Sequence, residues 1–103
     1  MYRQRIHQEI LHGQFREYLK IADDVLARRQ ALGVASARLW VPTVGAANTI
    51  VWEIDYPDLA SYQRENAVFY SDEGAMKHWR ALWQLTAQGS VRDELLEEAA
   101  QIA

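Results

Sequence analysis

The sequence predicts a single α+β domain in which helices pack on a sheet of four strands. Segments with the two-residue alternation of a strand and segments with the three-and-four spacing of an amphipathic helix support this fold class. They follow one another as strand, helix, strand, strand, split helix and strand. The 50% hydrophobic and 24% charged residues are typical of a globular chain, and 103 residues suit one domain, which we take as residues 1–103.

The first strand is expected over residues 2–9 and the first helix over residues 14–32. An extended backbone places Ile6 and His7 on opposite faces, because successive side chains of a strand alternate. In the helix, apolar side chains recur along one side and charged side chains occupy the other. Gly33 follows directly as the left-handed residue that commonly ends a helix.

A hairpin is expected from residues 35–41 and 48–54. The first of these segments alternates in polarity, and the second is rich in β-branched and aromatic residues. Pro42 ends the first strand, since proline has no N–H to donate to a neighbouring strand. Residues 45–47, Gly-Ala-Ala, form the turn.

Two helices are expected after Pro57. Asp58 is placed as the N-cap of the first, because its side chain can accept a hydrogen bond from the first turn. The helical pattern breaks at residues 70–72, where Ser71 is expected to cap a further helix that runs to Gly89. The apolar side of that helix consists of Met76, Trp79, Leu82, Trp83 and Thr86.

The segment of residues 90–96 has a composition that favours a helix, because Glu and Ala dominate it. We nevertheless expect a strand, followed by a frayed or helical end. The preceding elements are one strand short of a split βαβ sandwich, and without that strand a sheet edge would stay exposed.

Composition and charge argue against several classes of function. The formal charge of −3 is spread along the chain, which does not provide the basic surface that nucleic acid binding requires. The chain has no cysteine and therefore no disulfide or thiolate chemistry. No apolar run reaches the roughly 20 residues that span a bilayer. The polar start has no signal-peptide core, so we expect a cytoplasmic protein that is not integral to a membrane.

Two stretches of sequence carry a family resemblance. Residues 51–62, Val-Trp-Glu-Ile-Asp-Tyr-Pro-Asp-Leu-Ala-Ser-Tyr, precede residues 71–79, Ser-Asp-Glu-Gly-Ala-Met-Lys-His-Trp. They resemble the dimeric α+β barrel superfamily, which has a ferredoxin-like βαββαβ fold, and within it NIPSNAP-like and antibiotic-biosynthesis-monooxygenase-like proteins. Pro57–Asp58 replaces the usual serine start of the helix, and Gly74 stands where phenylalanine is common. The resemblance implies a homodimer that pairs the sheets of two copies.

In such a dimer each strand has one face toward its own helices and one toward the partner. The helix side is expected to hold Ile6, Leu39, Val41, Ile50, Trp52 and Ile54. The partner side is expected to hold Arg3, Arg5, His7, Arg38, Trp40, Val51 and Glu53. Arg and Glu on neighbouring strands of that side could form ion pairs.

Three alternatives for function remain open. The first is a protein that binds a small apolar or aromatic molecule in a cleft between sheet and helices, lined by Trp40, Trp52, Tyr62, Phe69, Trp79 and Trp83. The second is a cofactor-independent monooxygenase acting on an aromatic substrate, for which His78, Tyr62 and His7 offer a base and a phenol donor. Core packing is the simpler explanation for aromatic residues at helical spacing.

The third alternative is a haem-binding monooxygenase, since relatives in the superfamily that degrade haem carry a histidine on the helix where His78 stands. Those relatives also have an Asn on the first strand and a Trp earlier on the helical segment. Here residues 2–9 contain no Asn, and the corresponding helix offers Tyr62, Phe69 and Tyr70 in place of the Trp. We therefore expect no cofactor. His7 and His12 are five residues apart and His78 is distant, so we expect no metal site either.

Overall fold

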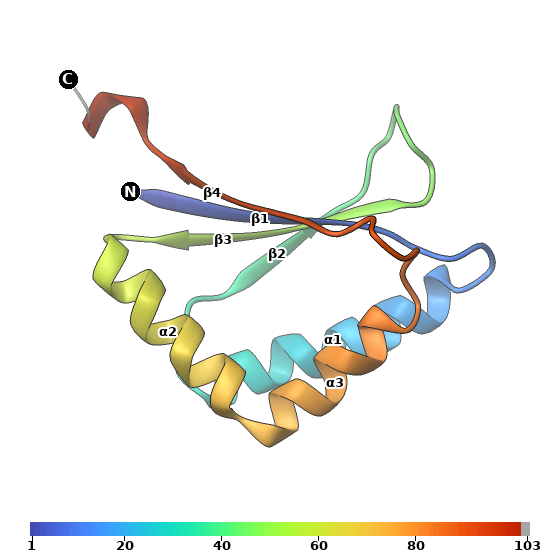
Figure 1. Ribbon diagram of the computed structural model, residues 1–103, viewed down its shortest axis with the longest axis horizontal. Coiled ribbons are helices and arrows are strands. Elements are labelled where there is room, and N and C mark those ends of the chain that lie inside the picture. The colour runs from blue at the N-terminus through green and yellow to red at the C-terminus, as the bar shows by residue number, and fades with distance from the viewer. Residues whose placement is uncertain (102–103) are drawn as a thin grey trace.

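The computed structural model describes residues 1–101, which form a four-stranded sheet and three helices (Figure 1). In chain order the elements are β1 (Tyr2–Glu9), α1 (Phe15–Ala31), β2 (Ala37–Trp40), β3 (Thr49–Tyr56), α2 (Leu59–Ser71), α3 (Glu73–Trp83), β4 (Arg92–Glu97) and a 3-10 turn (Ala99–Gln101). This order confirms the α+β class and the split second helical region. The predicted tail continues to residues 102 and 103, which lie outside the described residues. None of the helices described is long and apolar enough to cross a membrane.

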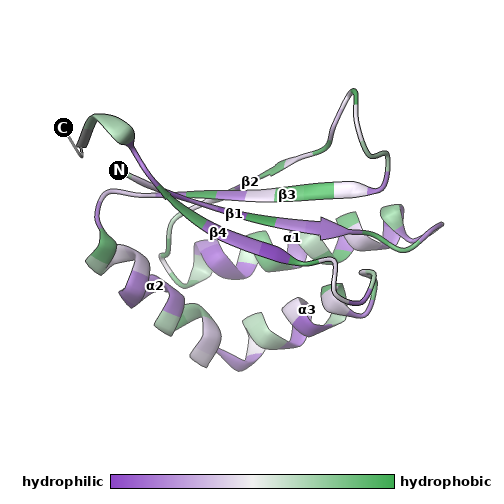
Figure 2. Cartoon of the chain, turned by 45° about the horizontal axis from the view of Figure 1, so that its top comes forward, coloured by the Kyte–Doolittle hydropathy of each residue, from purple (hydrophilic) through white to green (hydrophobic). Residues whose placement is uncertain are grey.

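The sheet has the strand order β2-β3-β1-β4, and neighbouring strands are antiparallel. Helices α1, α2 and α3 all lie on one side of the sheet, which we call the covered face (Figures 1 and 2). No described element lies over the other side, which we call the open face. The loop between β2 and β3 rises on the side of the open face (Figure 1).

The hydrophobic core lies between the covered face and the helices. Strand alternation brings five of the predicted residues to this side, buried or half-buried: Ile6, Leu39, Ile50, Trp52 and Ile54. Trp52 meets Trp79 of α3 edge to face, with 5.3 Å between ring centres, an arrangement that stabilises aromatic pairs. The Trp52 indole N–H donates to the Tyr18 hydroxyl of α1 at 2.7 Å. One strand residue therefore anchors two helices.

β2 is shorter than the predicted strand over residues 35–41. The backbone N–H of Ala35 donates to the Glu65 carboxylate, and the Ala35 carbonyl accepts from the Arg29 side chain, so this residue is hydrogen-bonded outside the sheet. Pairing with β3 also stops before Val41, which is 54% exposed. The assignment of Val41 to the helix side is therefore wrong, because the strand that would hold it there has already ended.

Both helices after β3 begin with an aspartate cap. Asp58 accepts from the backbone N–H three residues on at 2.7 Å and caps α2, as predicted. The predicted cap of α3 is wrong, since Ser71 is the last residue of α2 and Asp72 caps α3 instead. Asp72 is held in this position by Arg28 of α1, which donates two hydrogen bonds of 2.7 Å to its carboxylate. The corner between α2 and α3 is thereby fastened to α1.

Helix α3 ends at Trp83, earlier than the predicted end at Gly89. The backbone after the helix pairs with the chain beyond β1, where Ile10 forms a bridge with Thr86. This pairing draws the chain out of the helix. Gly89 lies in the next turn with φ of 76°, a conformation that glycine adopts without strain.

The segment Arg92–Glu97 forms the strand β4, although its composition favours a helix. It pairs with β1 from Tyr2 opposite Glu97 to His7 opposite Arg92. A hydrogen-bonded edge along β1 outweighs the differences in helix propensity, which are fractions of a kcal/mol per residue. The predicted strand over residues 90–96 is confirmed, with a start two residues later.

Candidate ligand-binding sites

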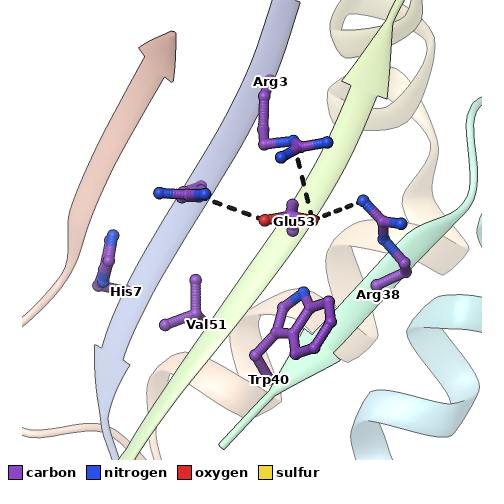
Figure 3. Close-up of a pocket in the computed structure, with 7 residues that line it drawn as sticks. Arg3, His7, Arg38, Trp40, Val51 and Glu53 are labelled. Carbon is purple, nitrogen blue, oxygen red and sulfur yellow. Dashed lines mark hydrogen bonds and ion pairs between the residues drawn. The ribbon is translucent and has the colours of Figure 1, made fainter. Parts of the chain in front are cut away.

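The open face carries a groove of about 530 Å³ (Figure 3). Its lining consists of the seven residues that strand alternation assigns to this face: Arg3, Arg5, His7, Arg38, Trp40, Val51 and Glu53. These side chains come from β1, β2 and β3, which are neighbours in the sheet. The groove is therefore a direct product of strand register.

Glu53 lies at the centre of this groove and is surrounded by arginines (Figure 3). Its side chain is 8% exposed, and its carboxylate is 2.5 Å from Arg38 and 3.2 Å from Arg5. Arg3 is 3.8 Å away and forms a closer bidentate pair with Asp55, at 2.7 and 3.1 Å. Hydrogen bonding to Arg3 holds the pKa of Asp55 below its ordinary value. Charges of both signs are thus neutralised within the open face.

His7 lies on the open face beside β4. Its Nε2 is 2.9 Å from the Glu94 carboxylate, and both ring nitrogens are 3.3 Å from Arg92. The hydrogen bond with His7 keeps the pKa of Glu94 below its ordinary value. His7 is therefore part of the charged network on the open face, remote from the space under the helices.

A second, enclosed space lies between the covered face and the helices, and we call it the inner cavity. Its polar lining includes Gln4, Arg29 and Asn66, and its aromatic lining includes Trp52, Phe69 and Trp79. Its volume is about 10 Å³. A space of this size holds about one water molecule. Side chains thus fill most of the region where the sequence predicts a cleft.

Neutral polar side chains form a connected chain along the inner cavity. Gln4, 2% exposed, accepts from the Tyr56 hydroxyl at 3.2 Å and donates to the Asp93 carboxylate at 3.1 Å. The Asn66 amide donates to the Tyr56 hydroxyl at 3.4 Å and to the Tyr62 carbonyl at 2.8 Å. Burial raises the pKa of Tyr56, so its phenol stays protonated at neutral pH.

The structure brings together half of the predicted ligand-binding residues. Those that line the inner cavity are Trp52, Phe69 and Trp79. Tyr62 lies next to them, with its ring edge to face on Tyr56 at 5.3 Å. Trp40 projects from the open face and is 53% exposed. Trp83 is 47% exposed and lines a separate groove beside β4, outside the inner cavity.

The predicted catalytic residues occupy three separate places. His7 belongs to the open face, and Tyr62 lies in the first turn of α2. His78 of α3 faces α1, where its Nδ1 is 3.9 Å from the Asp24 carboxylate. His78 thus is not among the residues that line the inner cavity. Within residues 1–101, no three His, Asp or Glu side chains are grouped as metal ligands.

The polar residues of the inner cavity escaped the sequence analysis, although two of them have a recognisable signal. Gln4 alternates with Ile6 on the buried side of β1. Arg29 continues the buried row of Ala22 and Val25 at helical spacing in α1. A polar residue within an apolar row marks a position where a buried group needs a partner. Asn66 lies on a half-exposed helix face and has no such signal.

No family model and no curated protein sequence matches this chain. Solved structures, however, match over nearly its full length. An uncharacterised NIPSNAP domain protein from Burkholderia xenovorans superposes with a TM-score of 0.80 at 20% identity, covering 97% of this chain and 96% of that one. A NIPSNAP family protein from Agrobacterium tumefaciens gives 0.77 at 19% identity, covering 95% and 92%. The chain has a NIPSNAP-like fold.

The NIPSNAP-like fold is shared with oxygenases. A mutant of SnoaB, a cofactor-independent oxygenase from Streptomyces nogalater, superposes with a TM-score of 0.69 at 17% identity, covering 95% of this chain and 93% of that one. Because a fold hosts many functions, these likenesses establish the architecture, and the function must be argued from the site.

Proposed function

We propose that this NIPSNAP-like protein binds a small aromatic molecule in the inner cavity. One observation carries the proposal: buried polar groups converge on aromatic walls in the same enclosed space. Gln4 and Arg29, 2% and 6% exposed, line it together with Trp52, Phe69 and Trp79. Small-molecule sites typically combine apolar walls with a few placed polar groups.

Binding requires the inner cavity to enlarge, and α2 is the element that can move. Of its thirteen residues, Ser61 and Phe69 are the buried ones, so few side chains hold it to the core. In Figure 1, α2 runs at an angle to the sheet and meets α3 at the corner farthest from it. Because Asp72 fastens the C-terminal end of α2 to Arg28, an outward movement of the rest of the helix would have to be accompanied by a rotation of the Phe69 side chain to leave room for an aromatic ring. Elements with few buried contacts are the ones that open locally at low cost.

Binding is favoured over catalysis because no histidine is among the described residues that line the inner cavity. His7 and His78 lie elsewhere, and His12 is in the exposed turn after β1. Burial raises the pKa of Tyr56 and of Tyr70, which removes these phenols as bases. The cofactor-independent monooxygenase considered from the sequence therefore has no histidine base among the described residues that line the cavity.

The four tryptophans allow a site-resolved test of this function. In ¹⁵N-labelled protein each indole N–H gives its own NMR signal, which can be assigned with Trp→Phe variants. We expect at least one of benzoate, benzamide and benzylamine to shift the signals of Trp52 and Trp79 in a saturable way. Trp40 on the open face and Trp83 beside β4 serve as internal controls and should stay in place. Absence of any shift at Trp52 and Trp79 at millimolar ligand would contradict the proposed function.

We also propose that the protein is a homodimer whose two open faces pack together. Trp40, Val41 and Val44 are 53%, 54% and 93% exposed on or next to this face. Oppositely charged residues alternate across the same face, so a second copy turned by a two-fold axis can meet arginine with carboxylate. Light scattering at micromolar concentration should give twice the chain mass of 11.9 kDa. A monomer mass under these conditions would refute the dimer and leave ligand binding unaffected.

A further inference from the structure

Arg29 is a buried charge on the inner face of α1. It follows Ala22 and Val25 in the buried row of that helix and is 6% exposed. Its Nε and Nη2 donate to the Ala35 carbonyl at 3.1 and 2.7 Å, and the guanidinium lies 5.2 Å from the centre of the Phe69 ring. These contacts involve a neutral acceptor and an aromatic ring, so no anion is in direct contact with the positive charge among the described residues.

No carboxylate among residues 1–101 lies within 4.0 Å of the Arg29 guanidinium, although ion pairs are common elsewhere in this part of the chain. The preceding residue, Arg28, has a bidentate partner in Asp72. Glu65 is bonded to the backbone N–H of Ala35 and acts on the cavity from a greater distance. Arg29 thus differs from its neighbours in having a buried charge without an anion.

The charge of Arg29 acts directly on the inner cavity. Its proximity to the Tyr56 phenol opposes the effect of burial, which raises the pKa of that group. Arg29 lines the cavity together with Phe69 and Trp79, so a ring placed between these aromatic walls would lie within reach of the guanidinium. Asp93 lies on the β4 side, where it accepts the Gln4 amide, so an anionic group would be held at the Arg29 side.

We infer that the ligand of the inner cavity is a small aromatic carboxylate whose carboxylate pairs with Arg29. This inference rests on the proposed function and specifies its ligand class. The bonds to Ala35 use Nε and Nη2, and the guanidinium also lies against the Tyr56 hydroxyl, so the ligand carboxylate would be held between Arg29 and that phenol. The ligand supplies the anion that the chain lacks at this position, while the aromatic ring takes the place of Phe69 against Trp79. Hydrogen bonds to a charged partner in a dry site are stronger than those between neutral groups.

Three probes of similar shape and different charge test the inference on the wild-type protein. Benzoate, benzamide and benzylamine are titrated separately, with the indole signals of Trp52 and Trp79 as the measure of cavity binding. We expect benzoate to bind at least about tenfold more tightly than benzamide, and benzylamine to bind most weakly. Equal or stronger cavity binding of benzamide or benzylamine would overturn the inference while leaving the proposed function intact. If none of the three reaches the cavity, both fall.

Variants on α1 locate the anion site. Arg29→Gln should reduce the benzoate-to-benzamide affinity ratio to about one, and Arg29→Lys should retain part of the preference because it keeps the charge. Arg16→Gln is the matched control, since Arg16 is exposed on the same helix. An unchanged ratio in Arg29→Gln would refute the assignment of this residue. Should Arg29→Gln not fold, the wild-type probe series decides the inference by itself.

Discussion

The two faces of the sheet differ in whether their charged side chains are paired with opposite charges. On the open face, Arg3, Arg5 and Arg38 each lie within 4 Å of Glu53, and in the single protomer these arginines remain accessible to water. On the covered face, polar contacts are mainly between neutral groups such as Gln4, and the buried cation Arg29 has no carboxylate beside it among the described residues. Water and nearby carboxylates neutralise charges on the first face. On the second face an uncompensated charge is costly, and it therefore points to a function.

Alternation along one strand creates this difference. In β1, Arg3 and Arg5 face the open side, whereas Gln4 and Ile6 face the helices. Residues that are neighbours in the sequence thus lie on opposite faces of the sheet, and each face has its own environment. Substitutions on the two faces should therefore have different effects on stability and assembly.

The largest expected effect is the loss of stability in Trp52→Ala. Trp52 is 1% exposed, packs on Trp79 and donates to Tyr18, so its truncation leaves a cavity and removes one of the two hydrogen bonds of the Tyr18 hydroxyl, which still donates to Gln8. We expect the free energy of unfolding in urea to fall by about 3–5 kcal/mol. Trp40→Ala on the open face is the matched control and should cost far less at a concentration where the protein is monomeric. Similar losses in both variants would contradict the assignment of the core to the covered face.

A smaller effect is expected for Glu53→Gln on the open face. This change removes the carboxylate from between Arg5 and Arg38 and leaves their charges close together. Because Glu53 is nearly buried while the arginines are half-exposed, we expect a loss of about 1–3 kcal/mol in urea unfolding. Asp55→Asn is the control, since its side chain is 36% exposed, and it should lose less than about 1 kcal/mol. Equal effects at the two positions would show that burial of Glu53 has no energetic consequence.

Acid should weaken the corner that holds α2 over the covered face. The bidentate pair with Arg28 lowers the pKa of Asp72 from its ordinary value of 3.8 to about 2. A lowered pKa in the folded state contributes stability above pH 3.8, and this contribution is lost as pH falls toward 2. The melting temperature of Asp72→Ala should therefore lie below that of the wild type at pH 6, and the gap should narrow toward pH 2. A gap that is independent of pH would contradict a stabilising role for the charge of Asp72.

The smallest effect on the folded protomer, and the most specific for assembly, is expected for Trp40→Ala. Trp40 and Trp83 are similarly exposed, at 53% and 47%, but lie in different grooves. Trp40→Ala should raise the concentration at which light scattering detects the monomer. Trp83→Ala should leave the oligomeric state unchanged. The reverse result would move the interface away from the open face.

Local patterns predicted most of the elements because their signals are short-range. The alternation in residues 2–9, the long amphipathic helix and the Asp58 cap all appear in the structure. The errors occur where a distant residue takes over a backbone group. Arg28 selects Asp72 over Ser71 as the cap of α3, and the bridge between Ile10 and Thr86 follows the early end of that helix.

By itself, the sequence determined the α+β order and the division of the strand residues between two faces, since these depend on the periodicity of side chains along the backbone. The fold resemblance rested on the residues of two stretches, 51–62 and 71–79. The order of elements predicted a strand over residues 90–96 against local propensity, and the tertiary structure supplies the reason, because β1 offers Arg92–Glu97 an edge that no local propensity describes. The tertiary structure also separated His7, Tyr62 and His78 and placed Arg29 beside Phe69 without a carboxylate partner within reach among the described residues. Distances between segments far apart in the chain depend on how the layers pack, and those distances decide which side chains can form a site.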